Sequence, residues 1–174
     1  DLDGLKDLKL SHTKIGDLAP IAGLTNLELL NISSTQVADL GALKNMVNLR
    51  IVLADSSAVS SLSPLDDLHM LQRVYCNFTR IGQKEALNFL KKHPETSLVY
   101  ATPELNAWWK GMTTEWQSVF KFYEKIDARP TPEQLHRLAL VDSINIAGRA
   151  SLNSLAPLGR LILLRTLQCQ SSGI

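Results

Sequence analysis

A repeat with a period of 22 residues runs through the first half of the chain. Its copies begin at Leu5, Leu27, Leu49 and Leu71 and read LKDLKLSHTKI, LELLNISSTQV, LRIVLADSSAV and LQRVYCNFTRI. Positions 1, 4, 6 and 11 of this template are apolar, and position 9 is Thr or Ser. The segments that follow also repeat, as DLAPIAGL, DLGALKNM and SLSPLDDL. Because a unit of this length cannot bury its apolar side alone, the period predicts a stack of similar units.

The alternation within each copy predicts a short strand. Positions 4 and 6 point to one side of the strand, whereas positions 3, 5 and 7 point to the other. Cys76 and Cys169 both occupy position 6, so we expect buried free thiols that pack as small apolar residues. We expect the hydroxyl at position 9, for example in Thr35, to hydrogen-bond to the backbone of the turn.

The pattern returns near the end of the sequence. VDSINIAGR from Val141, SLAPLGRL from Ser154 and LRTLQCQSSGI from Leu164 follow the same template, with one extra residue after the first of them. The chain begins and ends within the pattern, which favours a fragment of a longer protein or ends that another element covers.

Between the two blocks the register is lost. The segment from Gln83 predicts a helix that stops near His93 and Pro94, followed by a strand at 98–100, as in an enlarged repeat. Thr102-Pro103-Glu104, Thr113 or Thr114, and Thr131-Pro132-Glu133 are expected starts of further helices. The predicted domains are a first repeat block at 1–101, a Trp-rich helical insertion at 102–134, and a second repeat block at 135–174 that is truncated within a repeat.

All three tryptophans, Trp108, Trp109 and Trp116, lie in the insertion. Trp109, Trp116, Phe120 and Tyr123 form one stripe at helical spacing, which predicts a buried face that packs the insertion onto the repeats and joins the two blocks. The alternative is an exposed aromatic platform for a sugar ring or a peptide, formed by Trp108, Trp109 or Trp116.

These segments resemble leucine-rich repeats of the 22-residue class, which includes bacterial internalins and a regulatory subunit of a protein phosphatase. The resemblance covers residues 1–81 and 141–174. It implies an α/β solenoid with a parallel sheet on the concave face and short helical returns, here interrupted by a helical insertion. Position 9 is usually Asn in that family, whereas it is Thr or Ser here. The internalins suggest a bacterial cell-surface or secreted setting, although the phosphatase-regulating relatives are intracellular.

Several function classes are disfavoured by the sequence. The formal net charge is +1 and the Lys and Arg residues are scattered, so no basic stripe for nucleic acid is present. The apolar run at 161–164 is far too short to insert into a membrane. The four histidines have no partner at metal-ligand spacing, and no nucleotide-binding or nucleophile motif occurs. We therefore predict no enzyme, cofactor or metal within this chain, and leave open a catalytic domain elsewhere in a longer protein.

The outward positions of the first block predict a binding surface. Leu29, Ile51, Leu53 and Tyr75 would form one apolar patch on adjacent strands, and polar residues would surround it. The candidate partner-binding residues are Leu29, Asn31, Ile51, Leu53, Asp55, Arg73, Tyr75 and Asn77. The hypothesis is a non-catalytic module that binds a protein or peptide on its concave face. The alternatives are a structural spacer within a larger cell-surface protein, or a carbohydrate-binding module that uses the tryptophans. The insertion or a neighbouring segment could also cover this face.

Overall fold

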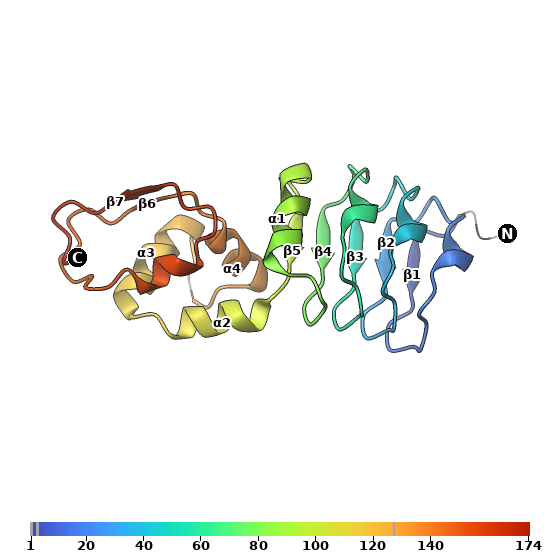
Figure 1. Cartoon of the computed structure of the whole chain (residues 1–174), viewed down its shortest axis with the longest axis horizontal. Coiled ribbons are helices and arrows are strands. Elements are labelled where there is room, and N and C mark those ends of the chain that lie inside the picture. Colours follow the sequence, from blue (N-terminus) through green and yellow to red (C-terminus); the bar gives the residue numbers. More distant parts are fainter. Residues whose placement is uncertain (1, 3, 127) are drawn as a thin grey trace. The chain divides into compact units, whose positions relative to one another are not determined.

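A computed structural model describes residue 2, residues 4–126 and residues 128–174 (Figure 1). Asp1, where the first predicted domain begins, and Asp3 and Asp127 lie outside the described residues. The described residues form two compact units, 1–101 and 102–174. Each unit has its own parallel sheet and its own apolar core.

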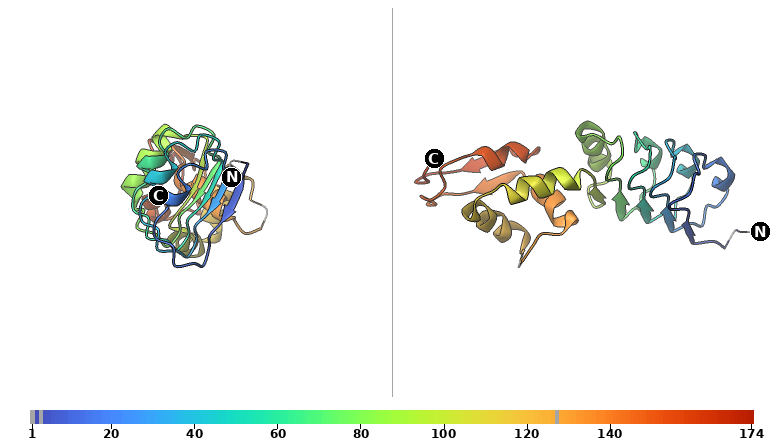
Figure 2. Two further views of the ribbon diagram at one scale, coloured as in Figure 1. Left: turned by 90° about the vertical axis from the view of Figure 1, so that its right-hand side faces the viewer. Right: turned by 90° about the horizontal axis from the view of Figure 1, so that it is seen from below.

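The described part of the first unit contains a sheet of five parallel strands that lie side by side in sequence order (Figures 1 and 2). The strands are β1 (Asp7–Lys9), β2 (Leu29–Asn31), β3 (Ile51–Leu53), β4 (Arg73–Tyr75) and β5 (Ser97–Val99). The register predicted from the 22-residue period is confirmed, because Leu30 lies opposite both Leu8 and Val52. The unit is therefore an α/β solenoid with short helical returns.

The returns of the first repeats are short 3-10 turns at Ala19–Ile21, Gly41–Leu43 and Ser63–Leu65. A side chain two residues before each turn accepts a hydrogen bond from the first backbone N–H of the turn. The Asp17 carboxylate accepts a hydrogen bond from the Ala19 backbone N–H at 2.8 Å, and Asp39 accepts one from Gly41 at 2.7 Å. The first residue of the repeated phrase DLAPIAGL thus bonds the backbone two residues later, a role that suits Asp and Ser at turns.

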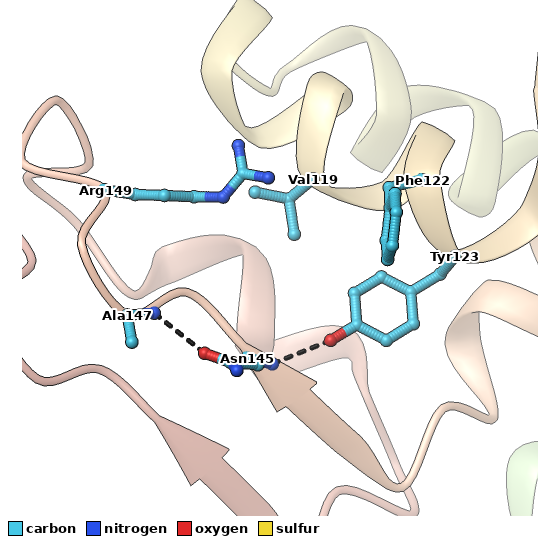
Figure 3. Close-up of a pocket in the computed structure, with 6 residues that line it drawn as sticks. All are labelled: Val119, Phe122, Tyr123, Asn145, Ala147 and Arg149. Carbon is cyan, nitrogen blue, oxygen red and sulfur yellow. Dashed lines mark hydrogen bonds between the residues drawn. The ribbon is translucent and has the colours of Figure 1, made fainter.

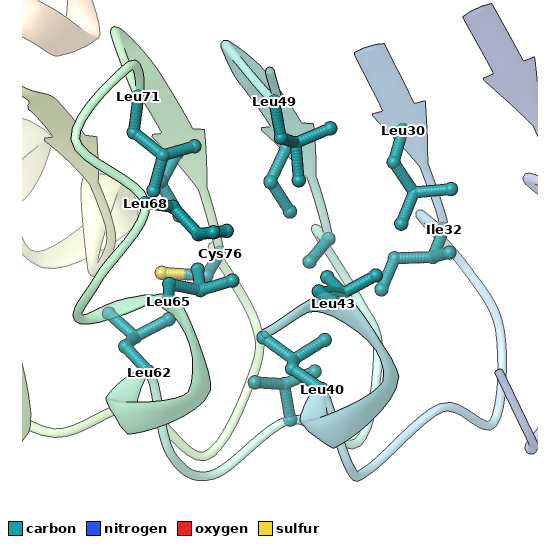
Figure 4. Close-up of a cluster of buried hydrophobic side chains, with 14 of the residues drawn as sticks. Leu30, Ile32, Leu40, Leu43, Leu49, Leu62, Leu65, Leu68, Leu71 and Cys76 are labelled. Atoms are coloured by element: carbon teal, nitrogen blue, oxygen red, sulfur yellow. The ribbon is translucent and has the colours of Figure 1, made fainter. Parts of the chain in front are cut away.

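The core lies between the sheet and the returns (Figure 4). Positions 4 and 6 point into it, as Leu30 and Ile32 show with no exposed surface. Cys76 is buried among these side chains, and burial raises the pKa of its thiol to about 12. Cys169 is also free but only half-buried, which differs from our expectation. It follows a strand of the small second sheet, where fewer neighbours cover the position-6 side chain.

The position-9 hydroxyls bind the turn as expected. Thr35 Oγ1 donates to the Ile32 carbonyl at 2.6 Å, and Ser57 Oγ donates to the Ala54 carbonyl at 2.7 Å. The same bond to the carbonyl three residues earlier recurs at Thr13, Thr79 and Ser172. The hydroxyl therefore supplies part of the contact that the family's Asn would make.

Position 8 has a left-handed backbone in every repeat that we describe. The values of φ are 60° at His12, 58° at Ser34 and Ser56, 56° at Phe78, 73° at Gly148 and 57° at Ser171. At His12, Ser34, Ser56 and Gly148 the N–H also donates to a carbonyl of the next repeat, as from Ser34 to Asp55 at 2.8 Å. The sequence did not indicate this feature, because glycine occupies one of these positions and other residues occupy the rest.

The fourth repeat is enlarged by a true helix, α1 (Gln83–Lys92), before β5 continues the sheet. The helix ends at His93, next to Pro94, as predicted, and the strand begins one residue earlier than expected. The Glu85 carboxylate attaches α1 to the preceding return, because its Oε1 accepts hydrogen bonds from Leu62 N–H at 2.7 Å and from Ser61 Oγ at 2.8 Å.

The second unit contains helices followed by a parallel strand pair. Its elements are α2 (Thr102–Lys110), α3 (Thr114–Glu124), α4 (Pro132–Ala139), β6 (Ser143–Asn145), a 3-10 turn at Ala156–Arg160 and β7 (Thr166–Gln168). Two of the three predicted caps are confirmed, whereas α2 begins at Thr102 itself rather than after it. Thr113 Oγ1 accepts from Trp116 N–H, and Thr131 forms a capping box with Gln134.

The aromatic stripe is buried within the second unit. Trp116 is 2% exposed, Phe120 0% and Trp109 7%, and they share one core with Ile144 and Leu152 of the returning repeats. The indole N–H of Trp116 donates to the Ser154 carbonyl at 2.9 Å, and that of Trp108 donates to the Pro157 carbonyl at 3.0 Å. The helices thus pack onto the second pair of repeats, so the predicted burial of the stripe is confirmed. The predicted joining of the two repeat blocks stays a prediction.

Candidate functional site

The strands bring six of the predicted site residues into two rows. Leu29, Ile51 and Arg73 lie opposite one another at position 3 on β2, β3 and β4. Asn31, Leu53 and Tyr75 do the same at position 5. Asp55 and Asn77 follow β3 and β4 at position 7. All eight therefore belong to the sheet face opposite the core, which we call the outward face.

Leu29, Ile51, Leu53 and Tyr75 form the apolar patch on the outward face. Each of these side chains is half-buried. The middle residue of each of the strands β2, β3 and β4 points the other way and is buried in the core. Neighbouring strands are about 4.8 Å apart, so the four side chains are adjacent. The patch therefore presents connected apolar surface rather than single scattered residues.

Two polar residues of the predicted rim, Asn31 and Asp55, form hydrogen bonds within the protein. The Asn31 side-chain oxygen accepts from Ser33 N–H at 3.0 Å, and Asp55 Oδ1 accepts from Asn77 N–H at 2.6 Å. Asn77 is only 9% exposed, which is less than its outward position led us to expect. The contact with Asp55, which reaches over from the neighbouring repeat, accounts for this burial.

The charged members of the rim differ in their surroundings. Burial raises the pKa of the Asp55 carboxyl, and hydrogen bonds from the backbone and side chain of Asn77 oppose the shift. Arg73 is exposed and forms no ion pair with any residue that the structure describes. Its guanidinium is therefore free to pair with an acidic group of another molecule.

A row of charges runs beside the apolar patch, and our reading of positions 3, 5 and 7 missed it. Lys6 Nζ lies 2.7 Å from Glu28 Oε1, and Arg50 Nε lies 3.7 Å from Glu28 Oε2. The hydrogen bond from Lys6 is the main cause of a lowered pKa at Glu28. The signal was present in the sequence, because these residues all occupy position 2 of the repeat.

Phe78 is a second feature that the sequence reading overlooked. Its side chain is 72% exposed at the left-handed position 8, directly after Asn77. An exposed aromatic ring beside the outward face adds contact area of the kind that protein interfaces favour.

The second unit bears on the carbohydrate-binding alternative. Trp109 and Trp116 are buried, so their ring faces cannot stack on a sugar, whereas Trp108 is half-buried. Trp108 and Trp116 line a cavity of about 270 Å³ together with Asn153 and Ser154. A sugar platform in the insertion would therefore rest on the partly exposed ring of Trp108.

The described residues contain neither a cluster that could hold a metal ion nor a helix that could span a membrane. No group of three or more His, Cys, Asp or Glu residues there is arranged to hold a metal ion. Within the same residues, no helix is both long enough and apolar enough to cross a membrane.

Comparisons with known proteins agree with this architecture. A sequence profile described as leucine-rich repeats (2 copies) matches residues 3–45. Internalin C2 from Listeria monocytogenes strain 4b F2365 is 32% identical, with a TM-score of 0.53, over 57% of this chain and 45% of that chain. The chain contains leucine-rich repeats of the internalin-like type. The chain spans less than half of internalin C2. This similarity therefore does not transfer the activity or the partners of internalin C2 to the chain.

Other leucine-rich-repeat structures are also similar. A leucine-rich-repeat protein of Leptospira interrogans is 19% identical, with a TM-score of 0.44, over 56% of this chain and 31% of that chain. A second internalin of the same Listeria strain is 18% identical, with a TM-score of 0.43, over 98% of this chain and 56% of that chain. A comparison with curated protein sequences finds no match.

Leucine-rich-repeat domains generally bind proteins, and internalin-like proteins are typically non-enzymatic scaffolds. The fold therefore supports a protein-interaction module in general terms. Fold alone does not identify the surface that is used or the molecule that is bound.

Proposed function

We propose that the chain is a non-catalytic module that binds a protein or peptide on the outward face of the first unit. The observation that carries this proposal is the apolar patch of Leu29, Ile51, Leu53 and Tyr75, which is continuous across three neighbouring strands. Connected apolar surface with a polar border is typical of protein-binding sites. Among the border residues, Tyr75 and Arg73 are of the types that most often dominate binding energy.

The chemistry of the border suggests what the partner offers. Arg73 has no acidic partner among the described residues, so it favours an acidic group on the bound molecule. The partner would place apolar side chains over Leu53 and Tyr75, beside that acidic group. Phe78, which is 72% exposed, would extend the contact beyond β4.

The test is a capture experiment with the double variant Leu53→Asp/Tyr75→Asp, using lysate and envelope fractions of the source cell. Two buried carboxylates at the centre of an interface should weaken binding by about tenfold or more. Val47→Asp/Met70→Asp is the matched control, because it adds the same charge at exposed apolar residues outside the strands, 57% and 45% exposed. Circular dichroism must show that both variants fold.

The outcomes separate the proposal from its main alternative. A protein captured by the wild type and the control but lost by the patch variant supports binding on the outward face. Equal capture by the patch variant contradicts this site. If the wild type captures nothing, a structural spacer becomes the better description of the module.

A further inference from the structure

A pocket of about 220 Å³ opens in the second unit between α3 and the segment that follows β6 (Figure 3). Its lining residues are Val119, Phe122, Tyr123, Asn145, Ala147 and Arg149. Helix α3 supplies the apolar wall, and the strand end with its turn supplies the polar groups. The pocket is separate from the apolar patch of the first unit, and the inference below does not depend on the proposed function.

Two hydrogen bonds fix Asn145 at the base of this pocket. Its backbone N–H donates to the Tyr123 hydroxyl at 2.7 Å, and its side-chain oxygen accepts from Ala147 N–H at 2.9 Å (Figure 3). In the described second unit, β6 pairs with β7 on one edge, and the Tyr123 hydroxyl meets the other edge. These bonds use the accepting oxygens of Asn145 and Tyr123 and hold the two side chains in place.

The side-chain hydrogens of these residues remain available as donors. The hydrogens of Asn145 Nδ2 and the hydroxyl hydrogen of Tyr123 meet no acceptor in the residues that the structure describes. Arg149 is exposed, forms no ion pair with a described residue, and extends toward Val119 (Figure 3). It is also the one charged residue among those described that line the pocket. Side-chain donors from three residues and one positive charge therefore border the same pocket, with Arg149 beside Val119 and the Tyr123 hydroxyl next to Asn145 (Figure 3).

Apolar surface completes the arrangement. The Phe122 ring is 78% exposed and lies edge-on to Tyr123, with ring centroids 6.0 Å apart. An exposed aromatic ring gains contact area when an apolar group packs against it. The wall beside the donors thus suits the apolar portion of a ligand.

We propose that this pocket binds a carboxylate that is attached to a small apolar group. An ionised carboxylate only accepts hydrogen bonds, and it pairs well with a guanidinium, so it matches a donor-rich pocket. A neutral sugar brings hydroxyl donors as well as acceptors and would leave the charge of Arg149 unpaired. The carboxylate could belong to a peptide C-terminus or to an acidic side chain, which share this chemistry.

The test is an NMR titration of the full chain that follows the side-chain N–H signals of Asn145 and Arg149. The probes are N-acetyl-Ala-Ala-Leu as the free acid, the same peptide as its C-terminal amide, and N-acetyl-Ala-Glu-Ala-amide. We expect at least one carboxylate peptide to give saturable shifts, with a dissociation constant on the order of 1 mM. The neutral amide should bind about tenfold more weakly or worse. The peptide that binds more tightly identifies the source of the carboxylate. Equal binding of acid and amide, or no binding by either carboxylate peptide, overturns the proposal.

Variants provide the second part of the test. Arg149→Gln should weaken binding about tenfold, because it removes the charge and the paired donors. Arg165→Gln removes an exposed arginine that does not line the pocket and should bind like the wild type. Phe122→Ser should weaken binding several-fold through lost apolar contact. Unchanged tryptophan emission confirms that each variant folds. Wild-type affinity in Arg149→Gln would rule out the site.

Discussion

Ser56 illustrates how the repeats impose a backbone conformation on residues that do not prefer it. Its φ of 58° lies in the left-handed region, and its N–H donates to the Asn77 carbonyl at 2.8 Å. The left-handed conformation costs a non-glycine residue roughly 1–2 kcal/mol. The neighbouring repeat therefore compensates a local cost through a hydrogen bond that a single repeat would lack.

This cost predicts opposite effects for two substitutions. Ser56→Gly should leave the first unit equally stable or more stable, because glycine adopts positive φ freely. Ser56→Val should destabilise it by roughly 1–2 kcal/mol, because a β-branched residue is strained there. Urea unfolding measures both, followed by the reactivity of the buried Cys76 thiol in chains that carry Cys169→Ser, because Cys169 is also free. The control is Ser60→Val, an exposed residue without positive φ, which should change little. A loss as large at Ser60 would show that the backbone conformation is not the cause.

Thr35 tests the hydroxyl at position 9. It is 7% exposed, donates to the Ile32 carbonyl and accepts a longer bond from Val37 N–H at 3.5 Å. Thr35→Val removes both bonds at nearly constant volume. The first unit should lose about 1 kcal/mol of unfolding free energy in the same assay. Thr13→Val removes the equivalent bond to Leu10 in an exposed turn, where water can replace it, and should cost less. Equal losses at the two positions would mean that burial does not set the effect.

At the scale of elements, the Glu85 carboxylate helps to attach α1 to the preceding return, together with the core packing of Ala86 and Phe89 and the ion pair of Lys92 with Asp66. Glu85 accepts hydrogen bonds from Leu62 and Ser61 on the preceding return. Glu85→Ala should cost about 1.5–3 kcal/mol, the range for hydrogen bonds to a charged group. The Leu62 amide should also exchange with solvent faster. Glu95→Ala removes an exposed acid after the helix and serves as the control. If Leu62 remains as protected as in the wild type, the carboxylate does not hold the helix.

Elements that are determined by residues close together in the sequence could be predicted, whereas features that depend on contacts between repeats could not. The strand positions and the caps at Thr113 and Thr131 are read from spacing and from single residues, and the structure agrees. The left-handed position 8 was missed because no residue type marks it, and the hydrogen bonds that its N–H donates at several copies reach carbonyls of the next repeat. The contact between Tyr123 and Asn145 was missed for a related reason, since it joins a helix to a strand outside the repeat register.

In the candidate site, too, the features set by the repeat spacing were predicted, and those set by contacts between repeats were not. The parity of positions 3 and 5 was enough to place Leu53 and Tyr75 side by side on the outward face. The burial of Asn77 was not foreseen, because it depends on the Asp55 side chain from another repeat. Side-chain hydrogen bonds between repeats decide which polar residues remain available, and spacing alone does not reveal them.

At the scale of the whole molecule, the described residues build separate cores in the two units. Residues up to Leu98 form the first core, and residues from Leu105 onward form the second. All three tryptophans belong to the second unit, whereas the buried Cys76 belongs to the first. Cys169 is a free thiol of the second unit, so it is replaced by serine in these measurements. Indole emission and the reactivity of Cys76 then report on different parts of the chain.

Trp116→Ala should affect one core and spare the other. Removing a side chain that is 2% exposed should cost the second unit about 3–5 kcal/mol, seen as earlier unfolding of the remaining tryptophans in urea. Cys76, whose pKa of about 12 keeps it protonated at pH 8, should stay as unreactive as in the wild type. Phe122→Ala, on the same helix but 78% exposed, should change neither signal appreciably. A reactive Cys76 in Trp116→Ala would show that the two cores unfold together.

The enlarged fourth repeat has an evolutionary consequence. Arg73 and Ser97 are paired although they are 24 residues apart, whereas Ile51 and Arg73 are paired at 22. The extra length is taken up where a 3-10 turn gives way to α1, on the side away from the outward face. Genetic insertions and deletions, which usually disrupt a compact domain, can therefore accumulate in the returns. A lineage can lengthen or remodel that side while natural selection keeps the strand face, and whatever it recognises, the same.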